Sequence, residues 1–126
     1  MHLTVYMHIR IFRTMFIQPE KLFRLLADAT RLRSLFLLQK EGSLCVCELT
    51  HALDVSQPLI SRHLGQLRDA GMVVDERRGQ WVHYRLADDL PDWVHEVISA
   101  SARGAERPWD IARERLHCMP NRPSLS

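Results

Sequence analysis

The chain has few cysteines, little net charge and no long apolar run. Each of these shortages limits the class of protein to which the chain can belong. It has three cysteines in 126 residues, an odd number, and Cys45 and Cys47 stand too close together for an ordinary structural bridge. A secreted disulfide framework is therefore excluded, and a reducing, cytoplasmic setting is expected. No apolar run approaches the length needed to cross a bilayer, so no membrane association is expected. The net charge of +2 permits nucleic-acid binding without indicating it, so any positive surface must be local.

The chain also lacks the common sequence signatures of catalysis. It contains no C-x-x-C pair, no glycine-rich phosphate loop and no evident pairing of a catalytic acid with a base. Because a thiol enzyme needs such an arrangement around its nucleophile, we do not expect an enzyme. No organic cofactor is expected either.

The two ends of the chain differ in composition from the middle. Residues 1–16 are apolar and basic with no acidic residue. His8, Arg10 and Arg13 interrupt the apolar centre that a signal peptide needs. This segment is predicted to be a loose arm or the product of an early start codon. The predicted organisation is an N-terminal extension at 1–16, a folded domain at 17–106, and a C-terminal helix with a flexible tail at 107–126.

Two helices are predicted at the start of the folded domain. Pro19 suits a first helical position, Asp28 suits the N-cap of the second helix, and Gly42 ends it. Arg31 and Arg33 are expected to face solvent. The apolar residues recur at helical spacing and form the predicted core: Leu22, Phe23, Leu25, Leu26, Leu32, Leu35, Phe36 and Leu38.

The middle of the chain predicts a helix-turn-helix followed by a hairpin. A short helix over 46–53 leads through a turn to Ser56, which is a strong N-cap for a second helix that ends at Gly71. The apolar period then changes from helical to two in MVVDE and WVHYRL, which predicts two strands joined by Arg77-Arg78-Gly79-Gln80. A last helix begins near Pro91. The fold class is therefore mainly α with a small β-hairpin, a winged helix-turn-helix.

This arrangement points to double-stranded DNA as the partner. A helix fits the major groove, and its N-terminal side chains reach the base edges. The predicted contacts are Ser56, Gln57, Ser61, Arg62 and His63 on the helix, and Arg77, Arg78 and Gln80 on the hairpin. The hairpin cations are expected to meet phosphate, which supplies affinity more than sequence choice. The alternative is a small helical protein with an ordinary charged face. For His63 alone, a packing role is favoured over a base contact.

Cys45 and Cys47 stand where the short helix begins. Thiolates are soft ligands that suit As(III), Sb(III), Cu(I) or Zn(II), and a helix N-terminus stabilises a thiolate. Residues i and i+2 of a regular helix do not face each other, so one ion can bind both sulfurs only if the first turn is distorted. The alternative is two small buried hydrophobes. Cys118 is a candidate third ligand, whereas His51, His95 and His117 more simply belong to solvated faces.

Three segments resemble the arsenic-responsive branch of the ArsR/SmtB family of metal-sensing repressors. They are LLADATRLRSLFLL, ELTHALDVSQPLISRHLGQLRDAGMV and RRGQWVHYRL, and the likeness covers about residues 19–100. The resemblance implies a winged-helix homodimer whose first and last helices form the dimer face. It also implies an inverted-repeat operator in an arsenic-resistance operon, released when As(III) or Sb(III) binds.

The resemblance also implies an inducer site at the paired cysteines. The family motif is C-V-C-x-x-C, and Cys45 and Cys47 match its first two positions, but Thr50 stands at the third. Two thiols are then expected to bind the inducer, with Cys118 or a small external thiol as the third ligand. The alternative is a repressor of the same fold that responds to zinc or to thiol oxidation.

Overall fold

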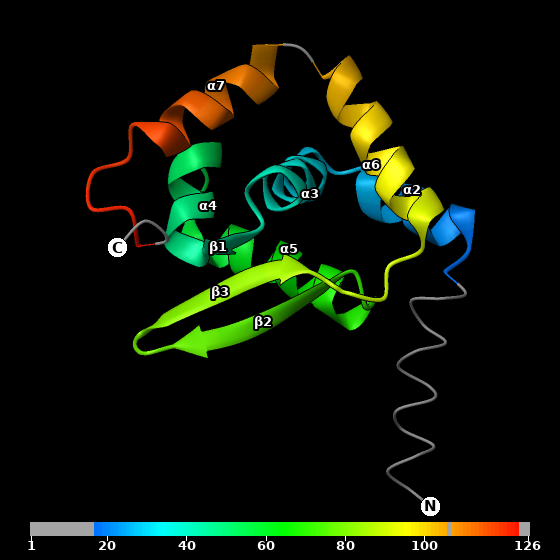
Figure 1. The fold of residues 1–126 in the computed structure, drawn as a ribbon, viewed down its shortest axis with the longest axis horizontal. Helices are drawn as coiled ribbons and strands as arrows, with labels where there is room; N and C mark the ends of the chain where they lie inside the picture. Colours follow the sequence, from blue (N-terminus) through cyan, green and yellow to red (C-terminus); the bar gives the residue numbers. More distant parts are fainter. Residues whose placement is uncertain (1–16, 106, 124–126) are drawn as a thin grey trace, which may run out of the picture.

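The computed structural model describes residues 17–105 and 107–123 and has the predicted class, mainly helical with a small antiparallel sheet (Figure 1). The prediction for residues 1–16 lies outside the described residues. The elements in chain order are α2 (Pro19–Leu26), α3 (Ala29–Glu41), β1 (Ser43–Cys45), α4 (Val46–Leu53), α5 (Gln57–Asp69), β2 (Val73–Arg78), β3 (Trp81–Leu86), α6 (Asp92–Gly104) and α7 (Arg107–His117). No helix in this part of the chain is long and apolar enough to cross a membrane.

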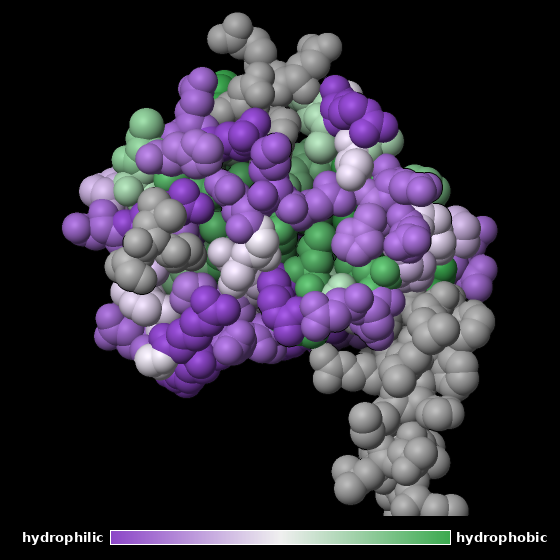
Figure 2. All heavy atoms as spheres, viewed as in Figure 1, coloured by the Kyte–Doolittle hydropathy of each residue, from purple (hydrophilic) through white to green (hydrophobic). Residues whose placement is uncertain are grey.

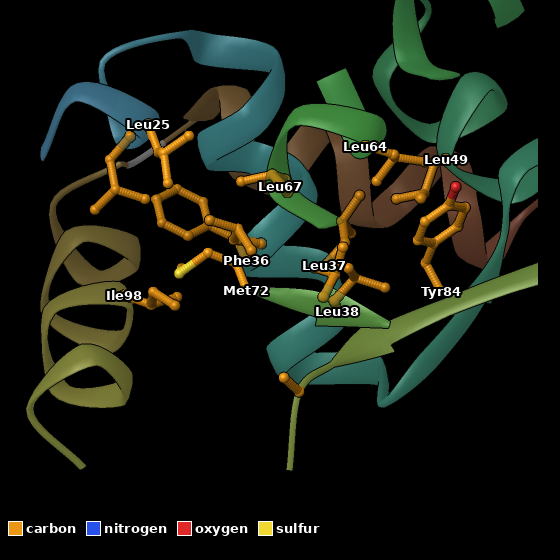
Figure 3. Close-up of a cluster of buried hydrophobic side chains, with 14 of the residues drawn as sticks. Leu25, Phe36, Leu37, Leu38, Leu49, Leu64, Leu67, Met72, Tyr84 and Ile98 are labelled. Atoms are coloured by element: carbon orange, nitrogen blue, oxygen red, sulfur yellow. The ribbon is translucent and has the colours of Figure 1, made fainter. Parts of the chain in front are cut away.

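Helix α3 is the centre of the core. Its residues 34–38 are all buried, which is expected of a helix that is covered on every side. Phe36 and Leu38 meet Leu64 and Leu67 of α5 in one buried cluster (Figure 3). Hydrophilic residues cover most of the face drawn in Figure 2, and hydrophobic ones are visible mainly in a central hollow. The core therefore holds α5 directly against α3.

The helix-turn-helix forms as predicted, because its local signals agree. Asp54 ends α4 in the left-handed region (φ 55°), which aspartate tolerates better than most residues. The Ser56 Oγ accepts a hydrogen bond from the backbone N–H of Leu59 at 3.4 Å, which caps α5. Pro58 lies in the first turn, where its missing N–H costs little.

The sheet has one strand more than predicted. Its order is β1-β3-β2, all antiparallel, with Cys45 opposite His83 and Arg78 opposite Trp81. The turn is also shorter than predicted, because β2 runs through Arg78 and only Gly79–Gln80 form the turn. Strand β1 has three residues, too few for an apolar period to be recognised in the sequence. Figure 1 shows the β2–β3 hairpin extending beyond the helices.

The C-terminal segment folds back onto α4. Helix α7 corresponds to the predicted C-terminal helix, and its Leu116 is fully buried. Within the described part of the tail, the Arg122 side chain is only 9% exposed and is paired with Glu48 and Glu41. Figure 1 shows the described end of the chain beside α4 and β1. The proline and serine content of the tail gave no sign of these contacts with distant acidic residues.

Candidate nucleic-acid interface and thiol site

The N-terminal part of α5 presents a polar face to solvent. Ser56, Gln57 and Arg62 are exposed and Ser61 is half-buried, as the groove-reading interpretation requires. Gln57 Nε2 donates to Ser61 Oγ at 3.2 Å, so these two side chains lie together one turn apart. The capping bond of Ser56 occupies its oxygen but leaves the hydroxyl proton available.

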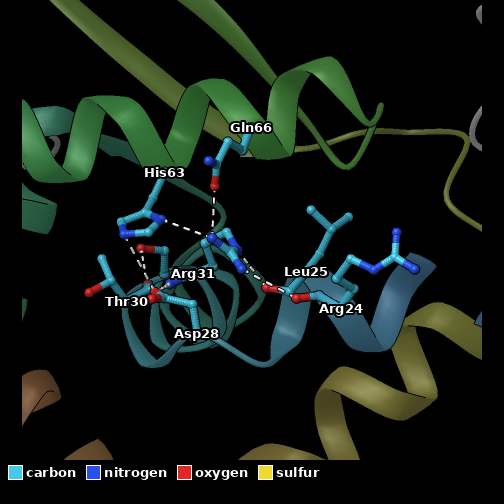
Figure 4. Close-up of polar contacts among 8 residues, drawn as sticks. Arg24, Leu25, Asp28, Thr30, Arg31, His63 and Gln66 are labelled. Atoms are coloured by element: carbon cyan, nitrogen blue, oxygen red, sulfur yellow. Dashed lines mark hydrogen bonds and ion pairs between the residues drawn. The ribbon is translucent and has the colours of Figure 1, made fainter. Parts of the chain in front are cut away.

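His63 is not part of this face, which corrects its inclusion among the DNA contacts. It is 7% exposed and points from α5 toward α3 (Figure 4). Its Nδ1 lies 3.1 Å from Arg31 Nη1, and its Nε2 lies 3.6 Å from Asp28 Oδ1. The packing role that the sequence favoured for His63 is therefore the one it has.

Arg31 was predicted to face solvent, but it instead joins three helices. Its guanidinium donates to the carbonyl oxygens of Arg24 and Leu25 at the end of α2, at 3.2 and 2.7 Å, and to Gln66 Oε1 of α5 at 2.7 Å (Figure 4). Carbonyls at a helix C-terminus have no partner within the helix, which makes them natural acceptors for arginine. This network fixes the orientation of the candidate recognition helix relative to α2 and α3.

Asp28 closes the same network. Its Oδ1 accepts from the backbone N–H of Arg31 at 3.1 Å and caps α3, as predicted. Burial raises the pKa of the Asp28 carboxyl. The backbone hydrogen bond of Arg31 and the electrostatic effects of the His63 and Arg31 side chains together outweigh that effect and leave the pKa below its ordinary value. The carboxylate is therefore ionised wherever DNA binding is relevant.

The hairpin carries the second predicted DNA surface. Arg77, Arg78 and Gln80 are all exposed. Arg78 Nη2 lies 3.4 Å from Glu76 Oε2, and Arg77 Nε donates to the Gly79 carbonyl at 3.4 Å. Exposed ion pairs are weak, so both guanidinium groups remain available for phosphate. Because only three residues lie between the end of α5 and the start of β2, the hairpin follows closely after the candidate recognition helix.

The two cysteine sulfurs face each other across a strand–helix junction. Cys45 ends β1 and is the N-cap of α4, with extended backbone (φ −69°, ψ 151°), whereas Cys47 lies in the first helical turn. Their Sγ atoms are 2.7 Å apart and both cysteines are free. The predicted need for a distorted first turn is therefore wrong, because Cys45 is not helical. The extended backbone of Cys45 is what brings the two sulfurs together.

A buried carboxylate supports this junction. Glu48 is fully buried, and its Oε1 accepts from the Cys45 backbone N–H at 2.8 Å. Its Oε2 accepts from Arg122 Nε at 2.6 Å. Sequence reasoning missed both residues. A signal for Glu48 was present in the sequence, because C-x-x-E is a capping box with cysteine in place of serine. No neighbouring residue indicated the role of Arg122.

The Cys47 thiol is held protonated, contrary to the expected stabilisation of thiolate. Burial, the hydrogen bond with Cys45 and the negative charge of Glu48 raise the pKa of the Cys47 thiol to about 12. These effects exceed the opposing influence of the helix N-terminus, whose backbone hydrogen bond lowers that pKa.

Alkylation should therefore separate the three cysteines. Because thiolate is the reactive form, iodoacetamide at pH 8 is expected to modify the exposed Cys118 first, and Cys45 and Cys47 only after unfolding in urea. Peptide mass spectrometry over time measures this order. The Cys118→Ser variant serves as the control and should label little while folded. Equal rates at Cys47 and Cys118 would contradict a raised pKa of the Cys47 thiol.

Comparison with known proteins places this geometry in a family. The model for bacterial regulatory proteins of the arsR family matches residues 28–74. The arsenic resistance transcriptional regulator ArsR1 of Pseudomonas putida is 56% identical over 105 residues, which cover 83% of this chain and 82% of that protein. The chain belongs to the ArsR family. The arsenical resistance operon repressor of Escherichia coli is 50% identical, over 82% of this chain and 83% of its own length.

Solved structures of similar fold agree with the ArsR-family assignment. The AntR antimony-specific transcriptional repressor is 33% identical with a TM-score of 0.58, over 68% of this chain and 74% of that one. Reduced HlyU from Vibrio cholerae is 31% identical with a TM-score of 0.60, over 68% of this chain and 86% of that one.

The structure does not bring a third protein thiol to the cysteine pair of this ArsR-family chain. Thr50, at the third motif position, donates its hydroxyl to the Cys47 carbonyl at 2.8 Å. Cys118 is exposed after α7. Within residues 17–105 and 107–123, no three His, Cys, Asp or Glu side chains are grouped to hold one metal ion. His117 instead pairs with Glu41 at 2.9 Å.

Proposed function

We propose that this chain is a transcriptional repressor of an arsenic-resistance operon, released from its operator when As(III) or Sb(III) binds Cys45 and Cys47. The observation that carries the proposal is the pair of free thiols, 2.7 Å apart, at the start of the helix before the recognition helix. The names of the relatives support arsenic or antimony as the inducer. A reducing cytoplasm is the setting in which free thiols and operator DNA coincide.

Arsenous acid can react with a protonated thiol such as that of Cys47 without releasing a proton to solvent. As(OH)₃ and two thiols form (RS)₂As–OH and two water molecules, so the thiol protons leave in water and none is released to solvent. Zinc, in contrast, must displace those protons, and a raised Cys47 pKa opposes that. Reaction with oxidants also proceeds through thiolate. This chemistry favours As(III) over the zinc and oxidation alternatives.

Inducer binding would reach DNA through α4. Bonding both sulfurs to one arsenic pulls on the N-cap and first turn of α4, whose other end leads through Asp54 into α5. A helix that moves at one end shifts the packing of its neighbour, because close-packed interiors do not deform smoothly. The coupling must be reciprocal, so DNA weakens inducer binding by the same factor that inducer weakens DNA binding.

We also propose a homodimer that binds an inverted repeat. Phe23 on α2 is 55% exposed although the sequence placed it in the core, and a second copy of the chain would cover it. Helices α2 and α6 overlap at one end of the molecule in Figure 1, and the proposed dimer face would lie at that end. A twofold axis there would present two recognition helices to half-sites about one DNA turn apart.

The deciding experiment is fluorescence anisotropy of a labelled inverted-repeat operator fragment, titrated with the reduced protein and then with arsenite. Arsenite is expected to weaken operator binding by wild type about 5- to 150-fold, a typical range for coupled sites. The variants Cys45→Ser and Cys47→Ser should bind DNA as wild type does and ignore arsenite, whereas Cys118→Ser should respond normally.

Other results would redirect the proposal. If Cys118→Ser also loses the response, Cys118 is a ligand after all. If wild type binds DNA and is released by zinc or peroxide but not by arsenite, the arsenic reading is wrong and the repressor fold stands.

A further inference from the structure

Two thiols leave one position of As(III) unsatisfied by the protein. In (RS)₂As–OH the remaining arsenic–oxygen bond carries a hydroxyl group, which is a hydrogen-bond donor. Cys45 is buried and Cys47 is half-buried, so a hydroxyl that points to the Cys45 side of the site needs an acceptor within the protein or loses stability. This inference rests on the proposed function and concerns the residue that meets the hydroxyl.

His83 is placed to be that residue. It lies on β3 directly opposite Cys45 in the antiparallel register, and opposite residues project from the same sheet face with Cβ atoms about 4.5–5.5 Å apart. Its side chain is buried, at 5% exposure beside a Cys45 that is 2% exposed. An imidazole at this distance reaches the space beside the Cys45 sulfur.

The imidazole also has a ring nitrogen without a partner. Nδ1 of His83 is buried and has no hydrogen-bond partner among the residues that the structure describes. Glu76, its neighbour on the other strand, pairs with Arg78 at 3.4 Å and does not bond to this nitrogen. Buried polar atoms without a partner are uncommon and call for an explanation.

We propose that Nδ1 of His83 accepts a hydrogen bond from the hydroxyl that remains on arsenic after Cys45 and Cys47 have bound it. His83 then takes the place of the third thiol that Thr50 cannot supply. It forms no bond to arsenic and loses no proton. Its neutral tautomer carries the proton on Nε2 and offers the Nδ1 lone pair. The ligand that this site recognises is an arsenic(III) or antimony(III) centre that keeps one hydroxyl.

Two inducers separate this role from simple packing. Arsenite leaves a hydroxyl on arsenic. Phenylarsine oxide reacts in water as C₆H₅As(OH)₂, gives C₆H₅As(SR)₂ and two water molecules, and leaves no hydroxyl. Loss of the His83 acceptor should therefore weaken the response to arsenite and leave the response to phenylarsine oxide unchanged. A packing defect at His83 would change both responses together.

Three variants test the proposal in the operator-release assay. His83→Asn keeps an acceptor oxygen near the Nδ1 position, His83→Gln moves it farther out, and His83→Leu removes it. The arsenite concentration for half-release is expected to rise about five- to tenfold in His83→Leu and His83→Gln, as for one lost hydrogen bond. In His83→Asn it should stay within about twofold of wild type. Phenylarsine oxide should release all four proteins at similar concentrations.

The outcomes distinguish this inference from the proposed function. If wild type responds to both inducers and the His83 variants match it with arsenite, or shift equally with both, the His83 role is overturned and the repressor proposal stands. If wild type responds to neither, the proposed function itself is wrong. Should His83→Leu not fold, the contrast between His83→Asn and His83→Gln still decides.

Discussion

Replacing Arg122 with leucine should lower the free energy of unfolding by about 3–5 kcal/mol, the usual effect of removing one partner of a buried ion pair. Glu48 is fully buried and Arg122 is 9% exposed, so the substitution leaves a carboxylate inside the protein without its cation. The same carboxylate accepts from the Cys45 backbone N–H, so the start of α4 should loosen as well. Urea unfolding followed by circular dichroism measures the change.

Matched variants show whether the effect belongs to the pair. Arg115→Leu removes an exposed arginine from the same segment and should change stability by less than about 0.5 kcal/mol. Adding Glu48→Gln to Arg122→Leu replaces the buried charge with a neutral amide that still accepts from Cys45. The double variant should therefore be more stable than Arg122→Leu alone. Equal stability of Arg122→Leu and Arg115→Leu would mean that the pair contributes nothing.

Replacing Arg62 with alanine should weaken operator binding by about 1–3 kcal/mol for each recognition helix, because an arginine that reads a base loses both affinity and discrimination. Arg62 is exposed near the start of α5 and is in the face proposed to enter the major groove. Anisotropy with the operator duplex and with a scrambled duplex measures the two effects. Binding to the scrambled duplex should change much less.

The hairpin offers the contrasting variant. Arg77→Ala should weaken binding to both duplexes alike and reduce the slope of log affinity against log salt by about 1 for each chain, as expected of a phosphate contact. Arg115→Ala, on α7, removes the same charge from an exposed position away from α5 and should have little effect. If Arg62→Ala behaves as Arg77→Ala does, then Arg62 contacts phosphate and does not read bases.

Much of the fold was predictable because its signals are local. The capping serine before α5, the proline in its first turn and the glycine that follows it each act within one or two helical turns. The β2–β3 hairpin was also predictable from a local signal, because the spacing of apolar residues changes there from helical to alternating. The strand β1 was missed because three residues carry no period, and it is recognised only by its pairing with β3.

The cysteine pair was only half predictable. The residue types pointed to a soft ligand, but helical geometry suggested that the two sulfurs diverge. Their approach depends on Cys45 being the extended N-cap, which follows from β1. The interpretation of His63 as a packing residue was available from its helical position, whereas its partner Arg31 was expected in solvent and lies against it.

The sequence by itself therefore determined the helix-turn-helix, its capped recognition helix, the basic wing and the presence of a thiol pair. These features depend on residues a few positions apart, whose periodicity and capping chemistry can be read directly. Only the tertiary structure decided that His83 lies opposite Cys45, and that Arg122 reaches Glu48 from 74 positions away. Strand register and the return of a chain end depend on how whole segments pack, and packing leaves no local pattern in the sequence.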